Sequence, residues 1–237
     1  TIDPADVIKA RQSVNNMRKN SFKSSKFLNW QELGPDNIGG RTRAILIDAT
    51  DPTYNTLYAG SVSGGLWKST TGGTAWTRIA EFDDNLAVSC ITQAPNGHIF
   101  VGTGEGLYDG IGNGGRGFIG NGAYKIEPEN NDKVTHLDAI APVPNQHSEY
   151  AYINKMECDP ISGRLYAATN RGLRVSDDEG ITWYNPIKLT GNVYNTSNSY
   201  DVDVSPDGGF VIAAVGNAAW ISPSGDSLTF VNKSGGG

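Results

Sequence analysis

The sequence predicts an all-β chain folded as a β-propeller of four-stranded antiparallel blades, preceded by a short helical arm. Three observations support this prediction: a repeat of short strand patterns, a turn motif of the form S-x-D-x-G-x-T-W, and a composition with 30 glycines and 11 prolines. A period of about 40–50 residues with four short strands per unit is typical of propeller blades. The chain shows four such units.

The turn motif covers residues 176–183 and matches the Asp-box signature at every position. Its spacing lets Ser176 and Asp178 hydrogen-bond the backbone of a tight hairpin turn, and Gly180 supplies the positive φ that such a turn needs. Thr182 and Trp183 begin the next strand. We therefore expect this turn to hold two strands together at the rim of the propeller, away from ligands. A degenerate copy covers 69–76 and a poor one 222–230.

Residues 1–28 form the predicted N-terminal arm. Asp3 as N-cap and Pro4 at the first helical position predict a helix over 3–20, and 21–28 read as a linker. The arm carries six basic and two acidic residues, a net charge of +4. The whole chain has a net charge of −6, so the residues after the arm carry −10. An acidic body argues against nucleic acid as the partner. No apolar run approaches the length of a membrane span.

Residues 29–237 form the predicted propeller domain, with blades near 44–80, 89–140, 153–187 and 199–234. Within each blade, runs rich in β-branched and aromatic residues alternate with Asn, Asp, Gly and Pro turns. The first strands of the third and fourth blades are predicted over 156–159 and 201–204. Tyr58, Phe100 and Tyr166 hold corresponding positions, 42 and 66 residues apart. Removing the long loop over 104–121 brings the second interval close to the first. We expect the four blades to be the N-terminal part of a larger propeller truncated at its C-terminus; a closed four-bladed ring is the alternative.

Several patterns that could bind a metal or cofactor lack the spacing for it. Cys90 and Cys158 have no metal-site neighbours, so we expect two small buried thiols. The Asp and Asn groups at 83–85 and 130–132 do not follow the spacing of a calcium loop. The G-x-G-x-x-G match at 110–115 is not followed by a helical pattern. We expect no metal and no cofactor.

Three stretches carry a family resemblance. They are 29–45, which contains Gly-Pro-Asp-Asn-Ile-Gly-Gly-Arg; 57–69, which contains Tyr-Ala-Gly-Ser-Val-Ser-Gly-Gly; and 101–105 together with 120–125. Together they resemble secreted bacterial proteins with sortilin-like, BNR-repeat propellers. The resemblance implies export by the type IX secretion system and a secreted or outer-surface location. The propellers also resemble those of sialidases, xyloglucanases and the sortilin ectodomain, which differ in function.

The enzymes among these relatives can be compared residue by residue. Xyloglucanases carry a catalytic Asp where this chain has Val62, and valine cannot exchange a proton, so that carboxylate pair is broken. Sialidases use an arginine triad, and Arg41 and Arg43 lie where such arginines would sit. The alternative for Arg41 is a bridge between blades.

The candidate ligand-binding residues are the two arginines at the start of the first inner strand and four groups of the 104–121 loop. They are Arg41, Arg43, Glu105, Tyr108, Arg116 and Phe118. Long loops in compact domains are often functional, although a solvated excursion is the alternative. No catalytic residue can be assigned.

The function expected first is non-catalytic binding of a glycan or a protein partner. One alternative is a sialidase-like glycoside hydrolase whose catalytic residues lie partly outside this chain. Another is cargo or an accessory part of an export, adhesion or gliding machine, with an outer-membrane export complex as the partner that the resemblance implies.

Overall fold

The computed structural model describes residues 41–80, 82, 87–106, 117–142 and 150–234, together with positions 6, 9–10, 12–14 and 16. These residues form four antiparallel sheets, so the all-β prediction is confirmed. Sheet 1 contains β1 (Thr42–Ile47), β2 (Leu57–Ser61), β3 (Leu66–Ser69) and β4 (Thr77–Arg78). Sheet 2 contains β5 (Val88–Gln93), β6 (Ile99–Thr103), β7 (Ala123–Glu127) and β8 (Lys133–His136). Sheet 3 contains β9 (Ile153–Cys158), β10 (Leu165–Thr169) and β11 (Gly172–Ser176), and sheet 4 contains β12 (Ser199–Val204), β13 (Val211–Val215), β14 (Ala218–Ser222) and β15 (Val231–Asn232).

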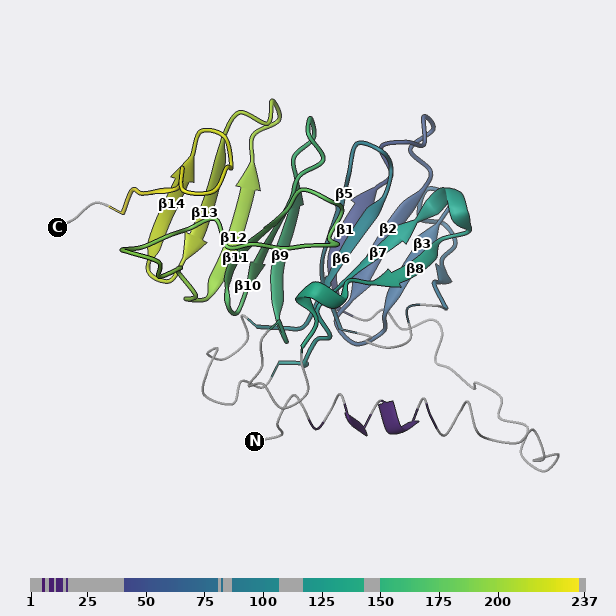
Figure 1. Cartoon of the computed structure of the whole chain (residues 1–237). Helices are drawn as coiled ribbons and strands as arrows, with labels where there is room; N and C mark the ends of the chain where they lie inside the picture. Colours follow the sequence, from purple (N-terminus) through teal and green to yellow (C-terminus); the bar gives the residue numbers. More distant parts are fainter. Residues whose placement is uncertain are drawn as a thin grey trace.

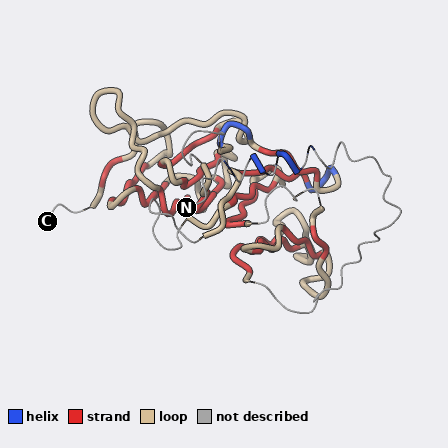
Figure 2. Tube along the Cα trace, turned by 90° about the horizontal axis from the view of Figure 1, so that it is seen from below, coloured by secondary structure: helices blue, strands red, loops and turns tan. Residues whose placement is uncertain are grey.

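Each sheet is built from strands that follow one another in the chain, and the sheets stand side by side in chain order from β1 to β14 (Figure 1). Two short 3-10 helices lie between strands, Pro128–Asn130 after β7 and Asp138–Ile140 after β8 (Figure 2). Because consecutive strands alternate in direction, every sheet has the same two ends. We call the end where the first strand begins the mouth end. The mouth end carries the loops between second and third strands and the connections between sheets. The opposite end, which we call the hairpin end, carries the turns between first and second strands and between third and fourth strands.

Sheet 3 is shorter than the four-stranded unit that the sequence predicts. Its fourth strand is reduced to one antiparallel bridge, in which Val175 and Tyr184 exchange two backbone hydrogen bonds of 2.9 Å. Pro186 follows two residues later and has no N–H to donate, which explains why the ladder ends there.

The first strand of each sheet contains a β-bulge near its start. In every case the second residue of the strand has no Cα partner on the neighbouring strand: Arg43 in β1, Ser89 in β5, Asn154 in β9 and Tyr200 in β12. A bulge bends the strand and redirects one side chain. The repeated unit therefore places one redirected side chain at the mouth end of each sheet.

Three of these redirected side chains reach the next sheet. Ser89 Oγ donates a 2.5 Å hydrogen bond to the carbonyl of Ile153, and Asn154 Nδ2 donates a 2.7 Å bond to the carbonyl of Ser199. Both acceptors are the first residue of the following sheet's first strand. Arg43 lies 3.5 Å from Glu105 of sheet 2. The bulges thus join successive sheets at the mouth end.

Ion pairs join the same sheets at the hairpin end. In each pair an acidic residue on the last turn of one sheet contacts a basic residue of the preceding sheet. The pairs are Lys68–Asp132 at 2.7 Å, Lys125–Glu179 at 3.3 Å and Arg164–Asp226 at 2.8 Å.

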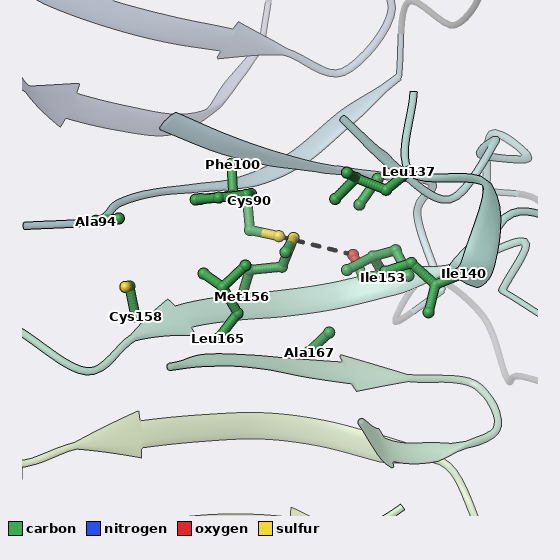
Figure 3. Close-up of a cluster of buried hydrophobic side chains, with 11 residues drawn as sticks. Cys90, Ala94, Phe100, Leu137, Ile140, Ile153, Met156, Cys158, Leu165 and Ala167 are labelled. Carbon is green, nitrogen blue, oxygen red and sulfur yellow. Dashed lines mark hydrogen bonds between the residues drawn. The ribbon is translucent and has the colours of Figure 1, made fainter. Parts of the chain in front are cut away.

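The core lies between the faces of successive sheets. Tyr58, Phe100 and Tyr166, predicted to correspond, are fully buried and each belongs to a different cluster. Phe100 packs with Met156 and Ile153 of sheet 3 (Figure 3). Cys90 and Cys158 are buried free thiols in this cluster, as predicted. The predicted helix over 3–20 and linker over 21–28 lie almost wholly outside the described residues and stay predictions.

The turn at 176–183 lies at the hairpin end of sheet 3. Ser176 Oγ accepts a 2.8 Å hydrogen bond from the Gly180 N–H, and Asp178 accepts bonds of 2.8 and 2.6 Å from the N–H and hydroxyl of Thr182. The Trp183 indole donates to the Gly180 carbonyl at 2.9 Å. Burial alone would raise the pKa of Asp178, but the hydrogen bonds from Thr182 and Ser176 hold it below its ordinary value.

Replacing Asp178 with alanine should lower the free energy of unfolding by about 1–2 kcal/mol at pH 7, because the turn loses its hydrogen-bond acceptor. A carboxylate whose pKa is lowered in the folded state contributes stability above its unfolded pKa of about 4, and this contribution is lost as the pH falls through the folded pKa. Urea denaturation should therefore show a smaller difference between Asp178→Ala and wild type at pH 3 than at pH 7. Ile181→Ala, which removes an exposed side chain of the same turn, is the control. Equal differences at both pH values would contradict this role.

Candidate functional site

The mouth end of sheets 1 and 2 brings together four of the six predicted ligand-binding residues. Arg41 precedes β1 and Arg43 is the bulged residue of β1, whereas Glu105 follows β6 and Phe118 lies on the segment returning to β7. Both arginines form ion pairs with the same carboxylate oxygen, Oε1 of Glu105. These pairs connect sheet 1 to sheet 2.

Glu105 is the buried centre of this group. Its side chain is 3% exposed, while the side chain of Arg41 is 57% exposed. Its backbone N–H donates to the Phe118 carbonyl at 2.8 Å, and its Oε2 accepts a longer bond, 3.4 Å, from the Phe118 N–H. A buried carboxylate is costly unless it is paired and hydrogen-bonded, and both conditions are met here. The group therefore presents one guanidinium and the Phe118 ring, 53% exposed, on a fixed base.

Glycines fix the two ends of the loop that carries Glu105 and Phe118. A Cβ on Gly104 would lie 2.4 Å from the carbonyl oxygen of Ala151, and one on Gly117 would lie 2.2 Å from that of Glu105. Gly120 donates a 2.8 Å backbone bond to the Ala151 carbonyl. At these positions glycine permits close backbone contact. The ends of the loop are thus packed against the segment that leads into β9.

The remaining predicted residues fall into two sets. Tyr108 and Arg116 are outside the described residues and stay predictions. The predicted turn residues lie at the hairpin end, so the described structure separates them from the arginine group. They are Ser176, Asp178, Gly180, Thr182 and Trp183.

Sequence reasoning missed the bulged residues of sheets 2 and 3. Asn154 is buried, and while its Nδ2 binds Ser199, its Oδ1 accepts no hydrogen bond from any described residue. That oxygen faces Gly106, whose added Cβ would lie 2.6 Å from it. The distance from the bulged residue to the start of the second strand varies between units, from 10 positions in sheet 2 to 14 in sheet 1, so aligning the units on their second strands does not reveal these residues.

Two further properties of the described residues concern metal binding and membrane spanning. They contain no group of three or more His, Cys, Asp or Glu side chains arranged to hold a metal ion. Among them, no helix has the length and apolar character needed to cross a membrane.

Comparison with solved structures identifies the arrangement as a β-propeller. Similar structures include the GH74 xyloglucanase from Xanthomonas campestris, with 18% identity and a TM-score of 0.57, covering 79% of this chain and 28% of that one. Another is the extracellular domain of a hybrid two-component system from Bacteroides thetaiotaomicron, with 15% identity, a TM-score of 0.57 and coverage of 85% and 23%. A third is YCF48 from Cyanidioschyzon merolae, with 15% identity, a TM-score of 0.51 and coverage of 83% and 56%.

This chain spans less than two thirds of the length of each of these structures. At such identities the likeness establishes the fold alone. No protein-family model matches the chain, and no curated protein matches it.

Proposed function

We propose that this chain is a non-catalytic propeller segment that binds an extracellular glycan or protein partner at its mouth end. The observation that carries the proposal is that buried Glu105 contacts both the Arg41 guanidinium and the backbone of Phe118, whose side chain is exposed. Arginine and aromatic side chains are the residue types that most often anchor interfaces. A fixed base reduces the entropy that such anchors lose on binding.

The finer assignments belong to the same proposal. We assign residues 1–28 to an arm and 29–237 to the propeller, and the turn at 176–183 to the Asp-box class of sortilin-like, BNR-repeat propellers. The hydrogen bonds of Ser176, Asp178 and Trp183 support this assignment. Secretion through the type IX system and a location outside the cell rest on the sequence resemblance.

The alternative, a sialidase-like glycoside hydrolase, needs an arginine triad that binds the substrate carboxylate, whereas most other glycoside hydrolases need two carboxyl groups on either side of the glycosidic bond. Glu105 lies at the mouth end, but it is buried and paired with two guanidinium groups. Val62, at the position of the xyloglucanase acid, is buried and cannot exchange a proton. These observations favour binding over hydrolysis.

A glycan array and a peptide-display library, screened with wild type, should yield a ligand whose affinity falls at least tenfold in both Arg41→Gln and Phe118→Ala. Losing an anchor residue typically costs more than about 1.4 kcal/mol, which is tenfold in Kd. Phe210→Ala, which removes an exposed phenylalanine at the hairpin end, is the matched control and should bind as wild type does.

Two results would count against the proposal. If both mouth variants retained full affinity for the selected ligand, the arginine group would be only a joint between sheets. Turnover in a fluorogenic glycosidase screen, abolished by Glu105→Gln, would instead establish the hydrolase alternative.

A further inference from the structure

A cavity of about 380 Å³ lies between the outer edge of sheet 1 and the last turn of sheet 2, away from the arginine group. Such a volume is within the range of small-ligand sites. The cavity has polar groups on the side of the ion pair and apolar side chains from the residues that flank β4. Its lining includes Lys68, Thr70, Thr77, Arg78, Ile79 and Asp132.

The cavity exists because the last turn of sheet 2 differs from that of sheet 3. In sheet 3 the turn brings Gly180 against Leu137 of sheet 2, so closely that a Cβ on the glycine would lie 2.7 Å from Leu137 Cδ1. Ile79 holds the position of Leu137 in sheet 1, since each donates its N–H to the first residues of the third strand. Ile79 faces the cavity because the sheet 2 turn does not fill this space.

That turn has an unusual backbone. After the 3-10 helix Pro128–Asn130, both Asn131 and Asp132 adopt left-handed conformations, with φ of 55° and 56°. Two successive non-glycine residues in this region are strained, and such strain persists where surrounding contacts fix it, often at ligand sites. Here the conformation carries the Asp132 carboxylate across to sheet 1.

The carboxylate forms a compact polar group with sheet 1. Lys68 Nζ lies 2.7 and 2.9 Å from the two oxygens of Asp132, and the Tyr58 hydroxyl donates to it at 3.1 Å. An ammonium has three donors and a carboxylate about four acceptor sites, so each keeps capacity for a ligand. The hydroxyls of Thr70 and Thr77 are exposed and make no hydrogen bond to another described residue.

We propose that this cavity binds one glycosyl residue of a carbohydrate, at a site separate from the proposed mouth site. Neighbouring sugar hydroxyls each offer a donor and an acceptor, which matches a carboxylate beside an ammonium and two threonine hydroxyls. The Lys68–Asp132 pair is neutral as a unit, and Arg78 is the other charged residue of the lining, so an inorganic anion is the competing ligand that the test includes. Ala75, Ile79 and Ala80 offer an apolar wall for the C–H face of a sugar ring.

The test is two-dimensional ¹H–¹⁵N NMR of the whole chain, titrated with the methyl glycosides of glucose, galactose, mannose and xylose, and separately with inorganic phosphate. At least one glycoside should produce saturable shifts at the amides of Thr77 and Asp132. The double variant Thr70→Val/Thr77→Val should raise its Kd at least fivefold, and Ala75→Phe, which fills the cavity, should abolish the shifts. Thr74→Val changes an exposed threonine of the same turn outside the lining and should leave the Kd unchanged.

Arg41→Gln separates this site from the mouth site, since it should leave these shifts unaltered even where it abolishes binding at the mouth. The proposal is overturned if none of the four glycosides gives saturable shifts at the lining amides. It is equally overturned if the double threonine variant binds as wild type does, or if phosphate binds more tightly than every glycoside. Single Thr77→Val keeps the test valid if the double variant does not fold.

Discussion

Phe100→Ala should lower the free energy of unfolding by about 3–5 kcal/mol, the usual cost of deleting a buried aromatic side chain and leaving a cavity. Phe100 is 0% exposed and packs between sheets 2 and 3. Ile212 has the same place in sheet 4, because the two residues occupy equivalent positions on their second strands, but it is 38% exposed. Ile212→Ala should therefore cost much less, about 1 kcal/mol.

Equilibrium urea denaturation of the two variants, with wild type in the same buffer, measures both values. The two residues share one position of the repeated unit but differ in side-chain size as well as in exposure, so part of the expected difference comes from the larger phenylalanine. Equal losses in the two variants would show that burial between sheets is not what stabilises this position.

Gly102→Ala should lower the free energy of unfolding by about 1–3 kcal/mol through overpacking. Gly102 lies on β6, where the edge of β9 approaches sheet 2. An added Cβ would lie 2.5 Å from Cys90 Sγ and 2.7 Å from Ile153 Cγ2. The equivalent residue of sheet 3 is Ala168, and there the next sheet begins with the smaller Ser199. The smaller residue, Gly102, thus faces a sheet that begins with the larger Ile153, and the larger residue, Ala168, precedes a sheet that begins with the smaller Ser199.

A double-mutant cycle with Cys90→Ala tests the cause of the loss. Deleting Sγ removes the nearest obstructing atom. The loss of unfolding free energy in the double variant should therefore be smaller than the sum of the two single losses by at least about 0.5 kcal/mol. Gly209→Ala is the control, since its added Cβ meets no atom closer than 3.4 Å. Strict additivity of the two substitutions would refute the packing explanation.

Most of the strands could be predicted from the sequence, because turn residues separate them and their interior positions alternate. The starts of the first strands could not. The patterns predict strands from Met156 and Asp201, but β9 and β12 begin at Ile153 and Ser199. Each missed start includes a bulged residue, which shifts the alternation by one position. A pattern of period two is therefore interrupted there.

The candidate site could be predicted only in part. Arg41, Arg43, Glu105 and Phe118 come from the residue types and the long loop, and the structure places them together. The pairing itself could not be foreseen, because Arg41 and Glu105 are 64 residues apart and belong to different sheets. The peripheral cavity was also hidden, since it depends on two left-handed residues that the composition of the turn does not specify.

Attachment at two points limits how neighbouring sheets can move. Each sheet is joined to the next by a bulged side chain at the mouth end and by an ion pair at the hairpin end. With a single attachment, two packed sheets could still pivot about it; with attachments at both ends, pivoting breaks one of them. The angle between neighbouring sheets is then fixed before any partner binds, so a partner at the proposed mouth site would meet a surface that is already in place.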